Sequence, residues 1–136
     1  MPRSRHSKGL QLACCLLAVA NLLLAQLAWA HHSMAMYDLH KQVTLNGTVT
    51  EFQWTNPHSW VDLQVPNGSG ASDAFGIEAG TPRSLARYGW NKHSLKPGDK
   101  VALVINPRRD GSRGGRLLKV VFPDGHVLST APSLEP

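Results

Sequence analysis

Residues 43–54, which read VTLNGTVTEFQW, decide the fold of this chain. Apolar residues alternate with polar ones as far as Val49, as in a strand with one buried face, and the alternation resumes with the opposite parity at Phe52. A β-bulge near Thr50 and Glu51 would account for this change, because a bulge adds one residue to a strand and bends it. The stretch therefore predicts a long, bent strand at the start of the folded domain.

Short strands separated by turn residues follow this stretch. Thr81 followed by Pro82 is typical of a helix N-terminus, and Gly89 can supply a left-handed end, so about two helical turns are expected there. The apolar patterns predict the remaining strands at 61–65, 75–79, 101–105, 117–122 and 127–128.

This order of elements predicts an all-β fold. We expect a small five- to six-stranded OB-like Greek-key barrel with one short helix between strands three and four. A small β-sandwich or an SH3-like barrel could be built from the same strands, so these two alternatives stay open. The barrel domain is expected to cover residues 43–128, followed by a disordered tail at 129–136.

Residues 1–30 have the organisation of a secretory signal peptide. Three basic residues precede a mostly apolar stretch, which ends in the small-x-small pattern Ala28-Trp29-Ala30. We therefore expect cleavage after Ala30, a mature chain that begins at His31, and a periplasmic location. Lipidation at Cys14 and an uncleaved membrane anchor are the alternatives, since the apolar stretch is nearly long enough to span a bilayer.

Composition bounds the chemistry of the mature chain. The 136 residues carry a formal net charge of +5 and two cysteines, but both cysteines and three of the 14 Lys and Arg residues lie in the expected signal. The mature chain is then nearly balanced in charge and free of cysteine. This excludes a disulfide, a thiolate metal site and a Cys nucleophile, and it argues against a nucleic-acid partner. No later stretch is apolar enough for a stable membrane span.

Several segments together resemble a known family. The matching pieces are His31-His32-Ser33, LNGTVTEF at 45–52, WTNPHSW at 54–60 and SLKPGDKV at 94–101. With these motifs the chain resembles a domain-of-unknown-function family of short exported proteins in Gram-negative bacteria. The resemblance implies export and a single small domain, and it assigns no catalytic residue.

The segment 31–42 is expected to form an arm rich in His and Met at the mature amino terminus. A terminal His can chelate a metal ion through its amine and its ring nitrogen, and imidazole and thioether groups together suit copper. Histidines outside the terminal pair could add nitrogen ligands if the arm folds back on the barrel. The candidate copper ligands are His31, His32, Met34, Met36, His40 and His58. The alternative is an exposed terminus that binds no metal specifically.

The loop after the first strand is a second candidate site. Trp54 and Trp60 flank a polar Asn-Pro-His-Ser core, in the loop that borders the usual ligand face of an OB barrel. Two indoles could stack on a sugar ring or another flat ligand, while Asn56 and His58 provide directional hydrogen bonds. Both tryptophans could instead belong to the core, with the polar residues only forming the turn.

The loop from Pro107 to Arg116 is a third candidate. Guanidinium groups can bind a phosphate or a carboxylate through paired hydrogen bonds. The loop contains four of them, on Arg108, Arg109, Arg113 and Arg116. A solvated loop without a ligand is the alternative interpretation.

We therefore predict an exported periplasmic binding or accessory protein that binds copper through its terminal His/Met segment. The alternative is a metal-free module for a small ligand or a periplasmic protein, which would use the Trp54–Trp60 and Arg108–Arg116 loops. No serine or acid pair has the setting of a catalytic group, so an enzyme is the third choice.

Overall fold

The structure is a computed structural model that describes residues 34–131. The expected signal at 1–30 and the end of the tail lie outside these residues. Within 34–131, no helix has the length and apolar character that crossing a membrane requires. The elements are β1 (Val43–Gln53), β2 (Trp60–Pro66), β3 (Ser72–Glu78), α2 (Pro82–Ala86), β4 (Lys100–Pro107), β5 (Gly114–Val121) and β6 (Val127–Ser129).

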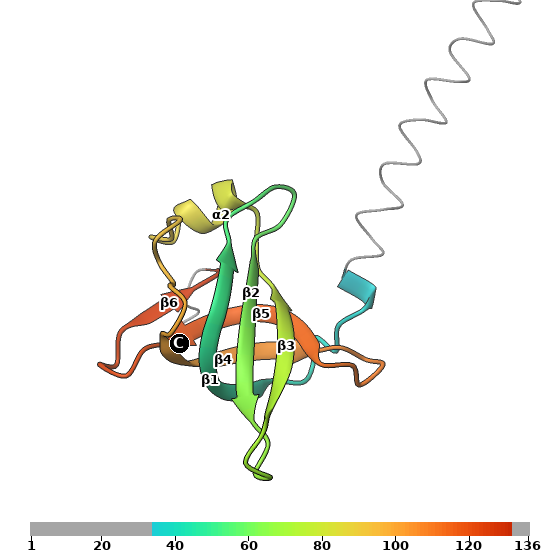
Figure 1. Cartoon of the computed structure of the whole chain (residues 1–136). Coiled ribbons are helices and arrows are strands. Elements are labelled where there is room, and N and C mark those ends of the chain that lie inside the picture. The colour runs from blue at the N-terminus through green and yellow to red at the C-terminus, as the bar shows by residue number, and fades with distance from the viewer. Residues whose placement is uncertain (1–33, 132–136) are drawn as a thin grey trace, which may run out of the picture. The chain divides into compact units, whose positions relative to one another are not determined.

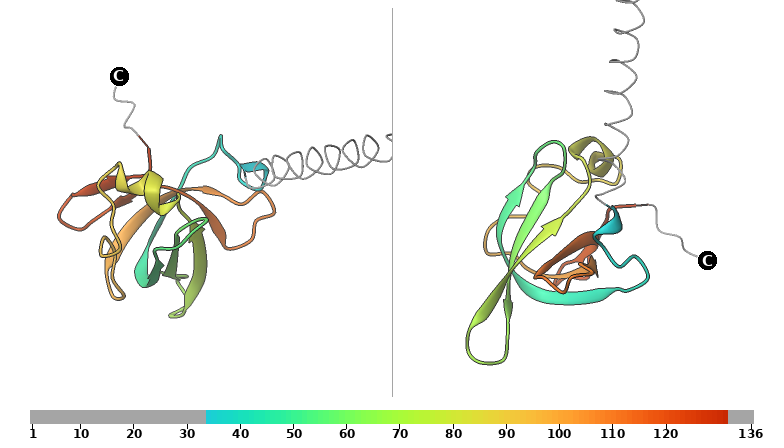
Figure 2. Two further views of the ribbon diagram at one scale, coloured as in Figure 1. Left: turned by 90° about the horizontal axis from the view of Figure 1, so that it is seen from above. Right: turned by 90° about the vertical axis from the view of Figure 1, so that its right-hand side faces the viewer.

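Five of the six strands close into a barrel. The hydrogen-bonded order is β3-β2-β1-β4-β5, and a parallel pairing of β3 with β5 closes the circle, while β6 pairs only with β5. In Figure 1, β1, β2 and β3 run side by side across β4 and β5, and the turn between β2 and β3 extends beyond the other strands in both Figures 1 and 2. The closed barrel with a helix between β3 and β4 confirms the predicted OB-like architecture.

The predicted bulge is present in β1, and it lets this one strand pair with β4 along its first part and with β2 along its last part. The first part of β1 pairs with β4 as far as Thr48, and the last part pairs with β2 from Thr48 onwards. The register shifts between Val49 and Glu51, which face Leu63 and Asp62. Two residues of β1 thus oppose one step of β2, and the strand bends where it changes partner.

Helix α2 begins as the sequence predicts and ends earlier. The Thr81 hydroxyl accepts a hydrogen bond of 3.0 Å from the Ser84 backbone N–H, which satisfies one of the free donors of the first turn. The helix is only five residues long, because the N–H groups of Arg87 and Tyr88 bond to carbonyls three residues back and tighten the chain. Gly89 then adopts the expected left-handed conformation, with φ of 85°.

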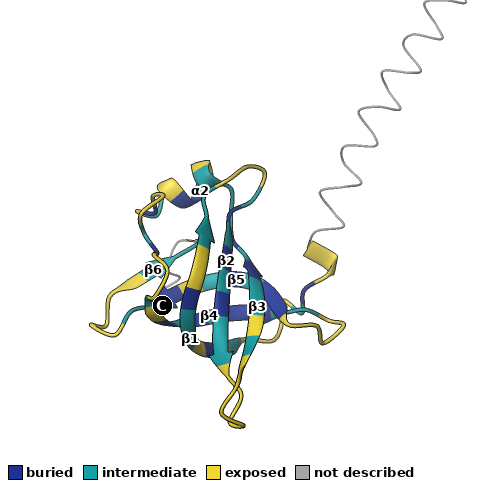
Figure 3. Ribbon diagram, in the orientation of Figure 1, coloured by how far each residue is buried: buried dark blue, intermediate teal, exposed yellow. Residues whose placement is uncertain are grey.

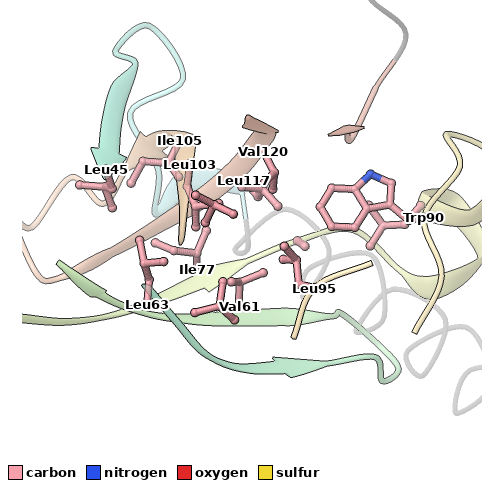
Figure 4. Close-up of a cluster of buried hydrophobic side chains, with 14 residues drawn as sticks. Leu45, Val61, Leu63, Ile77, Trp90, Leu95, Leu103, Ile105, Leu117 and Val120 are labelled. Carbon is pink, nitrogen blue, oxygen red and sulfur yellow. The ribbon is translucent and has the colours of Figure 1, made fainter. Parts of the chain in front are cut away.

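The barrel interior is filled by one hydrophobic cluster, whose buried strand residues come from β1 to β5, and Leu128 of β6 packs against it. Figure 4 shows Leu45 and Ile105 at one end of this cluster and Trp90 at the other. Figure 3 shows the buried positions concentrated along the strands and the exposed positions at the turns. The buried members are Leu45, Val49, Val61, Leu63, Ile77, Ala79, Leu85, Trp90, Leu95, Val101, Leu103, Ile105, Leu117 and Val120.

The segments at both ends of the barrel domain are held more firmly than expected. Tyr37 forms an isolated bridge with Arg108, and the buried Asn106 side chain donates a 2.8 Å hydrogen bond to the Lys41 carbonyl. At the other end, the indole N–H of Trp90 donates a 2.7 Å hydrogen bond to the Ser129 carbonyl. Part of the expected arm and the beginning of the expected tail are therefore integral to the barrel.

Strand β5 begins earlier than expected, because two glycines allow close packing at the closure of the barrel. A Cβ on Gly114 would lie 2.9 Å from the Gly76 carbonyl of β3, and a Cβ on Gly115 would lie 2.6 Å from the Asn106 carbonyl of β4. Gly114 and Gly115, which the sequence placed in the loop from Pro107 to Arg116, thus belong to a strand that packs closely between β3 and β4. Arg116 consequently lies in β5, where it is fixed by the sheet.

We expect Gly115→Ala to destabilise the fold by about 1–3 kcal/mol, because the new methyl group would overlap backbone atoms that cannot move freely. Gly76→Ala is the matched control, since its Cβ would meet only Asp62 Oδ1 at 3.7 Å. Urea unfolding of the two variants measures the difference. Equal midpoints would show that the closure tolerates a side chain.

Candidate ligand-binding face

The end of β2 presents a tryptophan on the outside of the barrel. Trp60 is half-buried and pairs with Gln53 of β1 and Glu78 of β3. Directly paired residues share a face of the sheet, and the residues next to Trp60 and Glu78 along their strands, Val61 and Ile77, are fully buried in the core. The polar side chains therefore lie beside the indole on the outer surface. We call the outward-facing set Gln53, Trp60, Asp62, Glu78 and Arg116 the outer face.

Glu78 is the centre of a hydrogen-bond network at the edge of the outer face. Its Oε1 atom lies 2.6 Å from Nδ1 of His58, in the loop between β1 and β2, and its Oε2 atom accepts a hydrogen bond from the Tyr37 hydroxyl. The Glu78 side chain is only 12% exposed, whereas the His58 side chain is 36% exposed. A carboxyl group that accepts from Nδ1 fixes the orientation of the imidazole and leaves Nε2 as the nitrogen available to a ligand.

Tyr37 is the buried member of this network. Its side chain is 1% exposed, and its carbonyl accepts a 3.0 Å hydrogen bond from Nε of Arg109. Burial, followed by the hydrogen bond to Glu78, raises the pKa of Tyr37 well above its usual value. The phenol is therefore a neutral donor at any physiological pH, and it holds the Glu78 carboxyl in one position.

Acidic side chains crowd the neighbouring part of the sheet. Glu51 of β1 directly opposes Asp62 of β2, and Gln53 donates a 3.5 Å hydrogen bond to Asp62. Burial, together with the Glu51 charge, raises the pKa of Asp62. Because the folded state holds the Asp62 proton more tightly than the unfolded state does, this pair destabilises the fold as the pH rises through the carboxyl range.

The two tryptophans of the predicted sugar-stacking pair lie on different sides of the sheet. Trp54 packs against the core cluster, with its ring centroid 5.9 Å from that of Phe52, whereas Trp60 lies on the outer face. Asn56 is exposed in the loop. Of the predicted loop residues, His58 and Trp60 thus lie beside Glu78. Trp54 instead packs against the core cluster.

The four arginines of the third candidate separate into different environments. Arg116 pairs with Glu78 across the parallel β3–β5 contact and belongs to the outer face. Arg109 bonds to the Tyr37 carbonyl, and Arg113 forms a 3.0 Å ion pair with Asp73. Arg108 has a buried Nε without a hydrogen-bond partner among the described residues. The four arginines therefore do not form a single anion-binding cluster.

The predicted copper ligands are only partly described. His31 and His32 lie outside residues 34–131, while Met34 and Met36 are 41% and 44% exposed. His40 is exposed, and its backbone N–H donates a 3.2 Å hydrogen bond to Asp38. The described part of the chain holds no group of three or more His, Cys, Asp or Glu side chains that could bind a metal ion.

Sequence reasoning did not assign a role to Tyr37, Gln53 or Glu78. The strand parity contained a usable signal, because Val61 faces inward and its neighbour Trp60 must then face outward with the residues paired to it. No comparable signal points to Tyr37, which is 41 residues from Glu78 in the chain.

The fold and this face define a small OB-like β-barrel protein with a candidate binding surface at the edge of β2 and β3. The chain belongs to a family of unknown function, DUF6152, whose sequence profile matches residues 19–117. No curated protein and no solved structure matches the chain.

We expect Tyr37→Phe to cost about 1.5–3 kcal/mol of stability at neutral pH, because Glu78 loses a hydrogen bond at a nearly buried oxygen atom. The wild-type protein should also lose stability as the pH rises above 10.0, the ordinary phenol pKa, since only the unfolded chain ionises Tyr37 there. Tyr37→Phe should lack this loss.

Urea unfolding between neutral pH and pH above 10 measures both effects. Tyr88→Phe is the control, because the structure gives the Tyr88 hydroxyl no hydrogen bond within the described residues. A Tyr37→Phe variant as stable as this control would contradict the role of the phenol.

Proposed function

We propose that this protein is an exported binding protein whose outer face binds a flat polar ligand, with a sugar ring as the expected class. One observation carries the proposal: a half-buried indole lies beside Gln53 and Glu78, next to an imidazole whose orientation the same Glu78 fixes. An indole stacks on the apolar face of a sugar ring, while amide, carboxyl and imidazole groups bond to its hydroxyls.

The charge of the surface supports a neutral ligand. Glu51, Asp62 and Glu78 lie on or next to the outer face, opposed by Arg116. A polyanion such as nucleic acid would be repelled from this surface, since nucleic-acid binding depends on cationic groups that neutralise phosphates. In OB barrels the face of the second and third strands is the common ligand surface, and it takes oligosaccharides as well as oligonucleotides.

The test is tryptophan fluorescence of the exported protein during titration with maltotriose, cellotriose and chitotriose. We expect a saturable change with at least one of them, and Trp60→Ala should weaken binding about tenfold or more, as loss of a central aromatic contact does. Trp54→Phe is the matched control and should bind normally, because Trp54 packs on the core. Either an unresponsive protein or normal binding by Trp60→Ala would refute the proposal.

A copper-binding terminus is the second candidate function. The supporting observation is that Met34 and Met36 are both substantially exposed, which keeps their thioethers accessible to a soft metal ion. Cleavage after Ala30 would add the amine and ring nitrogen of His31 and the imidazole of His32. The donor set suits copper in either oxidation state.

Native mass spectrometry of protein purified from the periplasm tests this second candidate. We expect a mass that begins at His31 and one bound copper ion after incubation with Cu²⁺, with His31→Ala binding at least about tenfold more weakly because the chelate loses a ligand. His93→Ala, at an exposed turn, is the control. An amino terminus other than His31, or equal copper binding by His31→Ala, would contradict it.

A further inference from the structure

The barrel interior is open at the end opposite Trp90. A cavity of about 310 Å³ lies where β1 and β5 begin and β4 ends. Its apolar walls are Val43, Leu45, Phe75 and Ile105, of which Leu45 and Ile105 are buried members of the core cluster and the other two are partly exposed. Figure 4 shows Leu45 and Ile105 together at this end of the cluster. The hydrophobic core therefore continues into an accessible cavity.

The entrance to this cavity is predominantly cationic. Lys41, Arg108 and Arg109 line it, together with a single acid, Asp38. Within residues 34–131, the two ion pairs of the structure join other residues, so none of the three cations has a carboxyl partner. Arg109 uses its Nε on a backbone carbonyl. Asp38 in the lining and the nearby Asp110, which interacts electrostatically with Arg108, offset part of the positive charge, and three cations against one lining acid leave the entrance cationic.

Arg108 is held in a position that only a glycine permits. A Cβ on Gly114 would lie 2.8 Å from Nε of Arg108, so the missing side chain at this position makes room for the guanidinium. Its Nε is buried and has no hydrogen-bond partner among the described residues. Arg108 as a whole is partly exposed and lines the cavity, so its positive charge can attract an anion there.

We propose that this cavity binds a small amphipathic carboxylate, with its apolar part against Val43 and Phe75 and its carboxylate at Lys41 and Arg108. Binding sites for small molecules combine apolar walls with a few placed polar groups, and they often lie in the mouths of β-barrels. The cavity is at the lower end of the usual range of about 300–1,000 Å³, which fits a short chain or one ring. The single acid at the entrance favours one negative charge over two.

This site shares no residue with the outer face, although Arg109 contacts Tyr37, which hydrogen-bonds to Glu78. It draws on the ends of β1, β4 and β5 and on the loop between β4 and β5, which projects at the right of Figure 1. The outer face uses Trp60 and Glu78, neither of which lines the cavity. The sugar proposal can therefore fail without affecting this one.

Isothermal titration of the exported protein with octanoate, octanamide and acetate tests the proposal. We expect saturable binding of octanoate at least about tenfold tighter than that of the other two, because octanamide lacks the charge and acetate lacks the chain. Val43→Phe should fill the cavity and abolish octanoate binding. Lys41→Gln and Arg108→Gln should each weaken it, while Arg83→Gln, an exposed arginine on α2, should not.

Thermal unfolding of each variant separates lost binding from lost folding, and Lys41→Gln changes an exposed side chain that takes no part in the core. The proposal is overturned if octanoate does not bind saturably, if octanamide binds as tightly, or if folded Val43→Phe binds like the wild type. A shift of backbone amide NMR signals confined to residues at the cavity would place the octanoate there, and shifts confined to the outer face would also overturn it.

Discussion

The bulge between Val49 and Glu51 is the constraint on which the barrel depends. One strand must pair with β4 along its first part and with β2 along its last part, and these partners lie on different sides of the barrel. The extra residue bends the strand at the point where the partner changes. It also resets the alternation, so that Phe52 and Trp54 face the core while Gln53 faces outward. Gln53 thus joins the outer face because of that single insertion.

The closure of the barrel brings the β3 and β5 residues of the outer face together. Parallel pairing of β3 with β5 places Arg116 beside Glu78, and this pairing requires the close approach that Gly114 and Gly115 allow. Glu78 is then reached from two further segments, by His58 and by Tyr37. The Glu78 carboxyl group holds both the phenol and the imidazole in fixed positions. The imidazole is therefore already ordered, and a ligand that bound to it would not have to pay the entropy of ordering it.

The strand alternation and the turn residues predicted the order of elements, because both signals are local, whereas a small β-sandwich and an SH3-like barrel stayed open until the β3–β5 pairing showed the closure. The parity change before Phe52 indicated the bulge, and Thr81 with Pro82 indicated the start of the helix. The polar network was beyond local reasoning, since it joins residues 41 positions apart and depends on which strands close the barrel. The sequence predicted a loop as far as Arg116, whereas Gly114 and Gly115 belong to β5 and permit tight packing within the sheet.

The two proposed sites differ in charge, and each proposal rests on that difference. On the outer face, burial raises the pKa of Asp62, and the directly opposed Glu51 charge adds to the increase. The cavity entrance has Lys41, Arg108 and Arg109 above apolar walls. An amphipathic acid is attracted to this entrance and repelled by the acidic pair, whereas an uncharged sugar gains nothing from unpaired cations. The charge distribution of this small barrel thus distinguishes the two proposed ligand classes.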